Sequence, residues 1–194
     1  MKLSKRKLRK LEKAAENYHA NDPAYKKDAN FSFFIYLVAV IVCALALRLF
    51  IFEPVRVDGD SMVPTLHNDE RMFVEKVSLW VSCPERGEII TCFYPGYKVS
   101  CVKRVIATPG ETVEIIGGEV YIDGARIDES RYWNGEIYAD MAPVTVPEGH
   151  VFVMGDNRND SKDSRNPSVG SIPYERIVGR CRAVIWPIGN QRDI

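Results

Sequence analysis

The chain has 194 residues, 46% of them apolar, which gives room for one folded domain with its own core and an appendage. Its formal net charge is zero, but residues 1–30 carry nine Lys/Arg and four acidic residues, whereas residues 53–194 carry 16 basic and 22 acidic residues. Because the basic charge is confined to a short tail and is not spread over a folded face, this distribution argues against binding to nucleic acid. We expect the basic tail to contact lipid head groups.

The first 18 residues predict a basic amphipathic helix, because Leu8, Leu11 and Ala15 recur at helical spacings of three and four residues. Two interpretations of this helix stay open: it binds lipid, or it is a solvated charged tail that only sets the topology of the chain. The residues Asn-Asp-Pro at 21–23 predict where it ends.

A 22-residue apolar segment, FSFFIYLVAVIVCALALRLFIF, covers residues 31–52. At ~1.5 Å per residue it forms a helix of ~33 Å, which matches a hydrocarbon core of about 30 Å. Arg48 lies near its end, from where the side chain can reach the interface. We predict a single transmembrane helix in the cytoplasmic membrane. Its basic flank should lie in the cytoplasm and residues 53 onward outside, by the positive-inside rule.

A cleaved signal peptide is the alternative interpretation of the same segment, since Ala-Leu-Ala at 44–46 has the small-x-small form of a cleavage site. That site would fall inside the apolar segment, and a charged leader of 30 residues is longer than usual. We therefore prefer the uncleaved anchor.

After Pro54 the pattern changes from helical to β. Short segments rich in β-branched and aromatic residues, separated by Gly, Pro, Asn and Asp, predict strands at 54–57, 71–77, 88–93, 98–106, 112–116, 119–122, 151–154 and 177–186. Gly-Gly at 117–118 and Asp-Gly at 123–124 predict hairpin turns. We expect a mainly β protein: a compact antiparallel sheet or barrel-like domain over residues 53–194, preceded by one transmembrane helix.

Five cysteines show no recognisable framework: Cys43 lies in the apolar segment, and Cys83, Cys92, Cys101 and Cys181 follow it without C-x-x-C spacing. No zinc site is expected from this pattern. Whether the last four pair or remain free thiols stays open.

Ser61 lies in GDSMVPTL, with a glycine two residues before it and a proline three residues after it. This pattern predicts a tight turn that exposes and holds the hydroxyl, although most serines in such turns are only structural. A nucleophilic serine needs a base, usually a histidine. The histidines of the chain, His19, His67 and His150, are not well placed for that role.

Lys103 is the alternative base. Side chains alternate along a strand, so Lys103 shares a face with Val99, Cys101 and Val105. Burial there would lower the pKa of the lysine and leave a neutral amine near pH 7. Such an amine can take the proton of Ser61. A solvated lysine at a strand edge stays open as the other interpretation.

The segment GDNRNDSKDSR at 155–165 is too polar for a core. It is either a flexible surface loop or a loop held near a site by its own charge network. Arg104 is a natural partner for Asp156, and Asp163 and Arg165 can pair locally.

Together the motifs SMxPTL, KRV followed by PGE, and GDNRxxSxDSR resemble those of the type I signal peptidases, membrane-anchored Ser/Lys enzymes that release exported proteins from their signal peptides. The resemblance runs from the apolar segment to about residue 180. Members of Gram-positive type usually have one N-terminal span and a compact domain like this one. The resemblance implies signal peptides and the phospholipid membrane as partners, a functional monomer, and no cofactor or metal.

By this resemblance Ser61 is the nucleophile and Lys103 the general base, and Ser161 hydrogen-bonds the lysine amine and orients it. Other positions that match the family's motifs are Met62 beside the site and Arg104, Asp156, Asp163, Ser164 and Arg165 in supporting roles. The Ser61 backbone N–H is expected in the oxyanion hole. Some members add a serine hydroxyl two residues before the nucleophile; here that residue is Gly59, so the second donor stays open.

The connection between membrane and nucleophile is short. Nine residues from Phe52 to Ser61 span at most about 30 Å. A signal peptide's cleavage site emerges just beyond its apolar part. Ser61 and the bond to be cleaved would therefore lie at the same height above the membrane. Residues 79–81, Leu-Trp-Val, fit a core strand, which we prefer, or a segment that dips into the membrane interface.

Two other functions are alternatives to this one. A sortase-like thiol transpeptidase would use a cysteine such as Cys92, but the chain lacks a well-placed histidine. An inactive membrane-anchored domain that binds extended peptides by β-augmentation would not need the set of Ser61, Lys103 and Ser161.

Overall fold

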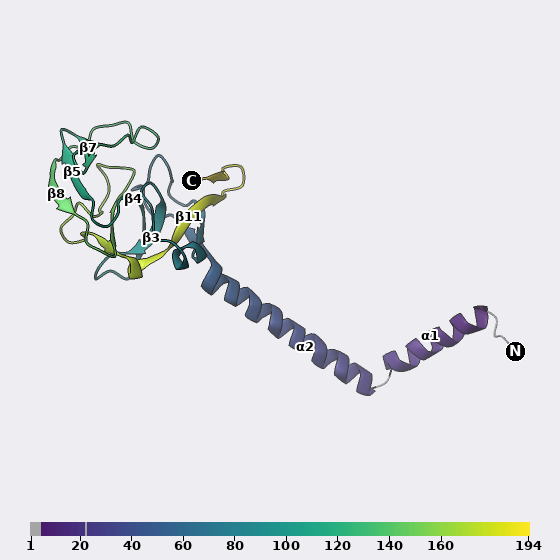
Figure 1. Cartoon of the computed structure of the whole chain (residues 1–194). Coiled ribbons are helices and arrows are strands. Elements are labelled where there is room, and N and C mark those ends of the chain that lie inside the picture. The colour runs from purple at the N-terminus through teal and green to yellow at the C-terminus, as the bar shows by residue number, and fades with distance from the viewer. Residues whose placement is uncertain (1–4, 22) are drawn as a thin grey trace. The chain divides into compact units, whose positions relative to one another are not determined.

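The computed structural model describes residues 5–21 and 23–194 (Figure 1). The chain divides into two compact units, Met1–Leu47 and Arg48–Ile194. The first contains helix α1 (Lys5–Asn21) and helix α2 (Pro23–Ala46). Helix α1 corresponds to the predicted basic helix. Part of that prediction falls on residues 1–4 and 22, which lie outside the described residues.

The apolar segment forms most of α2 and continues into a short π-helical turn, Leu47–Ile51. Its helical part, Asn30–Ile51, has 22 residues with a mean hydropathy of 2.7. No residue in the most apolar stretch of this helix is buried by protein. Helix of this length and composition is suited to a hydrocarbon core. Phe52, which the sequence placed in the helix, instead begins the first strand.

The second unit is mainly β, as predicted, and its paired strands are antiparallel (Figure 1). The strands of the larger sheet follow the order β1 (Phe52–Arg56), β2 (Arg71–Glu75), β11 (Ile177–Trp186), β3 (Ile89–Phe93), β4 (Ser100–Ala107), β9 (His150–Met154) and β10 (Ile172–Pro173), and β12 (Arg192–Asp193) pairs with β11. The smaller sheet has the order β7 (Ala125–Arg126), β6 (Glu119–Ile122), β5 (Thr112–Ile116) and β8 (Met141–Thr145). Bulges in β11 and between β4 and β9 interrupt the register, which bends a sheet.

The eight predicted strands are all present: three have the predicted bounds, and the ends of the others are shifted by at most two residues. Both predicted hairpin turns are confirmed: Gly117 and Gly118 have positive φ angles of 57° and 82° between β5 and β6, and Asp123 and Gly124 have 51° and 77° between β6 and β7. Left-handed backbone at both central positions is what a two-residue hairpin turn requires.

The prediction of a core strand at residues 79–81 was wrong. The chain forms a 3₁₀ turn, η2 (Val77–Trp80), and the side chains of Trp80 and Val81 are 65% and 85% exposed. The cause is local: the Glu75 carboxylate accepts hydrogen bonds from both the backbone N–H and the hydroxyl of Ser78, which ends β2 and starts the turn.

The sequence pattern missed β7, β8, β10 and β12. Three of these have only two residues, so no periodicity marks them. The exception, β8, contains Pro143 and is mostly exposed at the edge of the smaller sheet, where a proline is tolerated.

Strand β4 is buried on both faces, which matters for the site that it carries. Ile106 and Ala107 belong to an apolar cluster shared with the smaller sheet, while Val105 belongs to another cluster with Ile90 and Val153. A side chain on the central part of this strand is therefore surrounded by protein and shielded from water.

Candidate active site

Ser61 lies on a turn beyond the end of β1. Gly59 has a φ of 90°, a conformation that glycine adopts without strain, and its N–H donates to the side-chain oxygen of Asn68 at 2.9 Å. After the serine, Met62 and Leu66 are buried in the cluster formed by β1, β2 and β11. The turn is thus held from both sides, and Ser61 is left half-buried at its tip.

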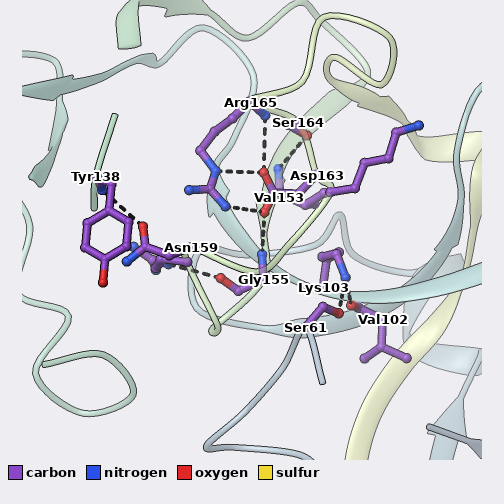
Figure 2. A network of polar contacts seen from close by, with 12 residues as sticks. Ser61, Val102, Lys103, Tyr138, Val153, Gly155, Asn159, Asp163, Ser164 and Arg165 are labelled. Atoms are coloured by element: carbon purple, nitrogen blue, oxygen red, sulfur yellow. Dashed lines mark hydrogen bonds and ion pairs between the residues drawn. The ribbon is translucent and has the colours of Figure 1, made fainter. Parts of the chain in front are cut away.

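Lys103 lies on β4, paired with Ile90 of β3, and its side chain reaches Ser61. The two reactive atoms, Lys103 Nζ and Ser61 Oγ, are 2.6 Å apart, and Nζ also donates to the Val102 carbonyl at 2.9 Å (Figure 2). Only 4% of Lys103 is exposed. The structure therefore excludes the solvated strand-edge lysine.

Burial lowers the pKa of Lys103 below its ordinary value of 10.5, and the neighbouring Cys101, Asp163, Cys92 and Asp156 oppose this in part. Removing an ammonium from water disfavours its charged form, so a larger share of the amine is neutral at a given pH. A neutral amine can accept a hydrogen bond from the Ser61 hydroxyl across the same 2.6 Å.

Ser161 does not make the hydrogen bond that was expected with Lys103. Among the described residues its buried Oγ has no hydrogen-bond partner. The hydroxyl packs against Gly155, whose missing side chain leaves space for Ser161 Oγ and for the Ser61 carbonyl oxygen. Ser161 thus lies beside Gly155, while the lysine amine makes its hydrogen bonds with Ser61 and Val102.

Arg104 and Asp156 form the expected ion pair behind the site. Arg104 donates to both carboxylate oxygens, at 2.8 Å from Nε and 2.6 Å from Nη2, and also to the Gly87 carbonyl at 2.8 Å. The Thr65 hydroxyl donates to the same carboxylate at 2.5 Å. Asp156 is fully buried, so this bidentate pair joins β4, the turn after Ser61 and the start of the segment 155–165.

Asp163 holds the other end of that segment. Its carboxylate accepts two hydrogen bonds from the Arg165 guanidinium at 2.8 Å and one from the Gly155 N–H at 2.9 Å (Figure 2). Ser164 forms a two-way link to Val153 of β9: the Val153 N–H donates to the Ser164 hydroxyl at 3.0 Å, and the Ser164 N–H donates to the Val153 carbonyl at 3.1 Å. The segment is a fixed loop and not a flexible one.

Sequence reasoning missed several residues that support this loop. Arg158 makes a buried ion pair with Glu129, and the Tyr94 hydroxyl donates to the Lys162 carbonyl at 2.6 Å. The Tyr132 ring stacks on Arg104, whose guanidinium carbon lies 4.0 Å from the ring centroid. Arg158 belongs to the motif GDNRxxSxDSR itself, but Glu129, Tyr94 and Tyr132 lie outside the motifs, so no spacing pattern assigned them as partners.

The two buried cysteines of the β unit, Cys92 and Cys181, are poor nucleophiles. All five, Cys43, Cys83, Cys92, Cys101 and Cys181, are free in the described part of the chain. Burial raises the pKa of Cys92 and of Cys181 to about 12, so their thiolates are scarce at neutral pH. This finding disfavours the sortase-like alternative built on Cys92.

Comparison with known proteins shows which proteins this chain resembles. A signal peptidase I from Bacillus amyloliquefaciens is 41% identical over 166 residues, covering 81% of this chain and 86% of the relative. Signal peptidase I T from Bacillus subtilis (strain 168) is 39% identical over 166 residues with the same coverage, and a probable signal peptidase I-1 from Synechocystis sp. is 42% identical over 160 residues, covering 78% of this chain and 80% of the relative.

A crystal structure of a signal peptidase I from Enterococcus faecalis V583 superposes with a TM-score of 0.46 and 32% identity, covering 52% of this chain and 97% of that one. The family described as signal peptidase, peptidase S26, matches residues 30–186. The chain therefore belongs to the signal peptidase family, peptidase S26.

Proposed function

We propose that this protein is a membrane-bound serine endopeptidase that removes N-terminal signal peptides from exported pre-proteins, with Ser61 as nucleophile and Lys103 as general base. The observation that carries the proposal is the 2.6 Å separation of Ser61 Oγ and Lys103 Nζ in a place where the lysine is buried. An inactive peptide-binding domain would have no need for a buried amine at that distance.

The reaction follows from the contacts of the two residues. The neutral Lys103 amine removes the proton as Ser61 Oγ attacks the scissile carbonyl, and the resulting ammonium then donates that proton to the leaving amine. Hydrolysis of the acyl-enzyme repeats the transfer with water in place of the serine. The Ser61 N–H has no partner among the described backbone hydrogen bonds and is free to stabilise the oxyanion.

Ser161 acts in this proposal as the residue that orients Lys103. Its unsatisfied hydroxyl lies in the same loop region, against Gly155 and the Ser61 carbonyl, so a small rearrangement on substrate binding would give it the lysine amine as a partner. Catalytic hydrogen bonds often tighten only in the substrate complex.

The membrane sets where the reaction takes place. The described residues include one apolar helix long enough to span a membrane, and the relatives of the chain are signal peptidases, which supports a membrane-anchored protein. In our proposal the basic tail stays in the cytoplasm and the β unit works on the outer face, where signal peptides emerge. The enzyme acts as a monomer and needs neither metal nor cofactor.

The test uses the full chain in detergent or in vesicles, with a precursor that carries a small-x-small cleavage site. Ser61→Ala and Lys103→Ala should each reduce cleavage by about a hundredfold to ten-thousandfold or more, the range expected for loss of an acid–base step. Ser100→Ala and Lys98→Ala are the matched controls, because both side chains are exposed on the same hairpin as Lys103 and should leave the rate unchanged. Cleavage that survives in either dyad variant would refute the proposed roles.

A further inference from the structure

Two cysteines lie directly opposite each other on neighbouring strands and take no part in the proposed reaction. In the antiparallel pair of β3 and β4, Cys92 is the register partner of Cys101, and Lys103 follows two residues further along β4 (Figure 1). Both thiols are free in this structure. The spacing of the cysteines left their pairing open, whereas the register of the sheet brings these two together.

Both thiols project from one face of the sheet. Directly opposed residues of an antiparallel pair have their side chains on the same side. Cys92 is fully buried in an apolar cluster with Ile90 and Val105, and Cys101 packs against the same cluster. The two side chains are therefore neighbours within one layer of packing.

Cys181 of β11 is not a partner for either thiol. Its Sγ lies 3.4 Å from Thr91 Oγ1. Since successive side chains along a strand point to opposite faces, Thr91 and Cys92 lie on opposite sides of β3. Cys181 is accordingly buried in a different apolar cluster, with Ile89 and Val184. The sheet separates it from the opposed pair.

The backbone spacing at the opposed pair is within the range of a disulfide. The Val105 N–H donates to the Glu88 carbonyl at 2.9 Å, and hydrogen-bonded and non-hydrogen-bonded pairs alternate along an antiparallel ladder. Counting from that bond makes Cys92 and Cys101 a hydrogen-bonded pair, with Cα atoms about 5.5 Å apart, and disulfides most often join Cα atoms at about 5.5–6 Å. The Cβ atoms of such a pair are about 5.5 Å apart, wider than the ~3.8 Å of a relaxed disulfide. Bond formation must therefore draw the two strands together, and the bond is readily reduced again.

Cys101 is the thiol that an oxidant reaches first, since it is half-buried whereas Cys92 is fully buried. A small disulfide, RSSR, reacts with the Cys101 thiol to give a mixed disulfide and one RSH. The Cys92 thiol then attacks the Cys101 sulfur, which forms the bond between the two cysteines and releases the second RSH. Two protein thiols are oxidised, one RSSR is reduced, and each thiol proton leaves with an RS group. The second step is intramolecular, which offsets the low nucleophilicity of the buried Cys92.

Lys103 lies on the same strand and the same face as Cys101. Its Nζ is 2.6 Å from Ser61 Oγ, and Ser61 lies on the turn after β1, outside both β3 and β4. A bond that draws β4 towards β3 at Cys101 therefore shifts Lys103 relative to Ser61.

We propose that Cys92 and Cys101 form a reversible disulfide when a small-molecule disulfide oxidises the protein, and that this bond lowers peptidase activity by displacing Lys103. In the proposed topology the β unit lies on the outer face of the membrane, where disulfides form and persist. Formation of the bond does not depend on peptidase activity, whereas its effect on cleavage rests on the proposed function.

Counting free thiols tests the bond. The full chain in detergent, with Cys43→Ala and Cys83→Ser replacing the two exposed thiols, is incubated under native conditions with oxidised glutathione. We expect Cys181 to remain the only thiol that reacts with a maleimide after denaturation, and a non-reducing digest to contain the peptides of Cys92 and Cys101 joined.

Two variants in the same background are the controls for this count. Cys181→Ser should form the bond as before, and Cys101→Ser should keep Cys92 and Cys181 as free thiols. Glutathione held on Cys101 while Cys92 stays free would overturn the proposal. A bond to Cys181, or a protein that keeps all its thiols, would overturn it as well.

Cleavage of a precursor tests the effect of the bond on activity. The oxidised protein should be about tenfold to a hundredfold slower than the reduced protein, the range that a displacement of up to roughly 1 Å at a reacting group produces. Dithiothreitol should restore the rate, and Cys101→Ser should have the same rate with and without oxidised glutathione. Equal rates before and after complete oxidation would overturn the effect on Lys103. A reduced protein that does not cleave at all would refute the proposed function instead, and the thiol count would still decide whether the bond forms.

Discussion

Lys103 shows how a side chain acquires chemical reactivity from its position. An exposed lysine is almost fully protonated at neutral pH and cannot accept a proton. Here burial favours the neutral amine, whereas Asp163 and Asp156 favour the charged form, and the net effect is a lowered pKa. Burial wins because the nearby carboxylates are already engaged by Arg165 and Arg104.

The first prediction concerns pH. In the proposed mechanism the neutral amine of Lys103 is the active form, so kcat/KM should rise with pH through the lowered pKa of Lys103 and reach its plateau below the ordinary value of 10.5. Below that pKa the amine is protonated and activity is lost. Measuring kcat/KM of the purified full chain as a function of pH tests this prediction. The control variant Lys98→Ala should have the same pH profile as the unmodified protein. Activity that keeps rising to pH 10.5 would show that burial does not activate the lysine.

The second prediction concerns Ser161. Its buried hydroxyl has no partner among the described residues, so Ser161→Ala removes an uncompensated polar group and should leave the free energy of unfolding unchanged or raise it by about 1 kcal/mol. The same change should reduce kcat about tenfold or more if the hydroxyl orients Lys103 in the substrate complex. Ser100→Ala, on the exposed end of β4, should alter neither quantity. Lower stability with unchanged kcat would contradict an orienting role.

At the scale of elements, the loop 155–165 is a rigid support whose two ends are anchored separately. Asp156 ties its start to Arg104 on β4, and Asp163 ties its end to Arg165 and to the Gly155 N–H. These contacts bring the loop against the strand that carries the lysine. The contact between Ser61 and Lys103 therefore depends on ion pairs that lie outside it.

The third prediction measures the first of these anchors. Asp156→Ala leaves the Arg104 guanidinium buried without its partner and should lower the free energy of unfolding by about 3–5 kcal/mol. Glu119→Ala breaks the exposed pair with Arg126 and is the matched control, expected to cost about 0–1 kcal/mol. Chemical denaturation of both variants in detergent gives the comparison. Equal effects would mean that burial adds nothing to the Arg104 pair.

The fourth prediction concerns the packing of the loop against the nucleophile. A methyl group at Gly155 would overlap both Ser161 Oγ and the Ser61 carbonyl oxygen, so Gly155→Ala must displace the site. We expect kcat/KM to fall about a hundredfold, the effect of a displacement of roughly 1 Å at a reacting group.

Gly179→Ala controls for crowding alone in this experiment. A side chain there would collide with the Glu75 carbonyl on β2, at a place without site residues. That variant should lose stability but keep its activity per folded molecule. Full activity in Gly155→Ala would show that the loop can move away from Ser61 without consequence.

At the scale of the whole molecule, the charge distribution supports the proposed orientation of the protein in the membrane. The tail has an excess of basic residues and the β unit an excess of acidic ones, on the two sides of one apolar segment. Basic flanks are retained in the cytoplasm during insertion.

The fifth prediction tests this topology by thiol labelling in intact bacterial cells. In a Cys83→Ser background, Lys98→Cys on the exposed β3–β4 turn should react with a membrane-impermeant maleimide. Lys10→Cys on the exposed face of α1 should react only after the cells are permeabilised. The reverse pattern would place the β unit in the cytoplasm and would be incompatible with a role in processing exported proteins.

Local sequence patterns determined the element types, because they depend on chemistry within a few residues. The apolar segment is long enough to span a bilayer, and the turns at 117–118 and 123–124 need residues that accept positive φ. Alternation along β4 indicated that Lys103 is buried, as observed, although Val99, which was expected on the same face, precedes the strand and is 73% exposed. The resemblance of three motifs to those of a known family also indicated the family to which the chain belongs.

Only the tertiary structure decided how distant residues meet. The 2.6 Å contact of Lys103 with Ser61 depends on β4 and the turn after β1 being brought together by the folded sheet, which no local pattern encodes. The missing hydrogen bond of Ser161 and the exposed position of Trp80 depend equally on long-range packing, against Gly155 and above Arg180. Sequence alone determined which groups are present and which elements carry them, because those depend on neighbours along the chain. Their distances, burial and pKa depend on neighbours in space.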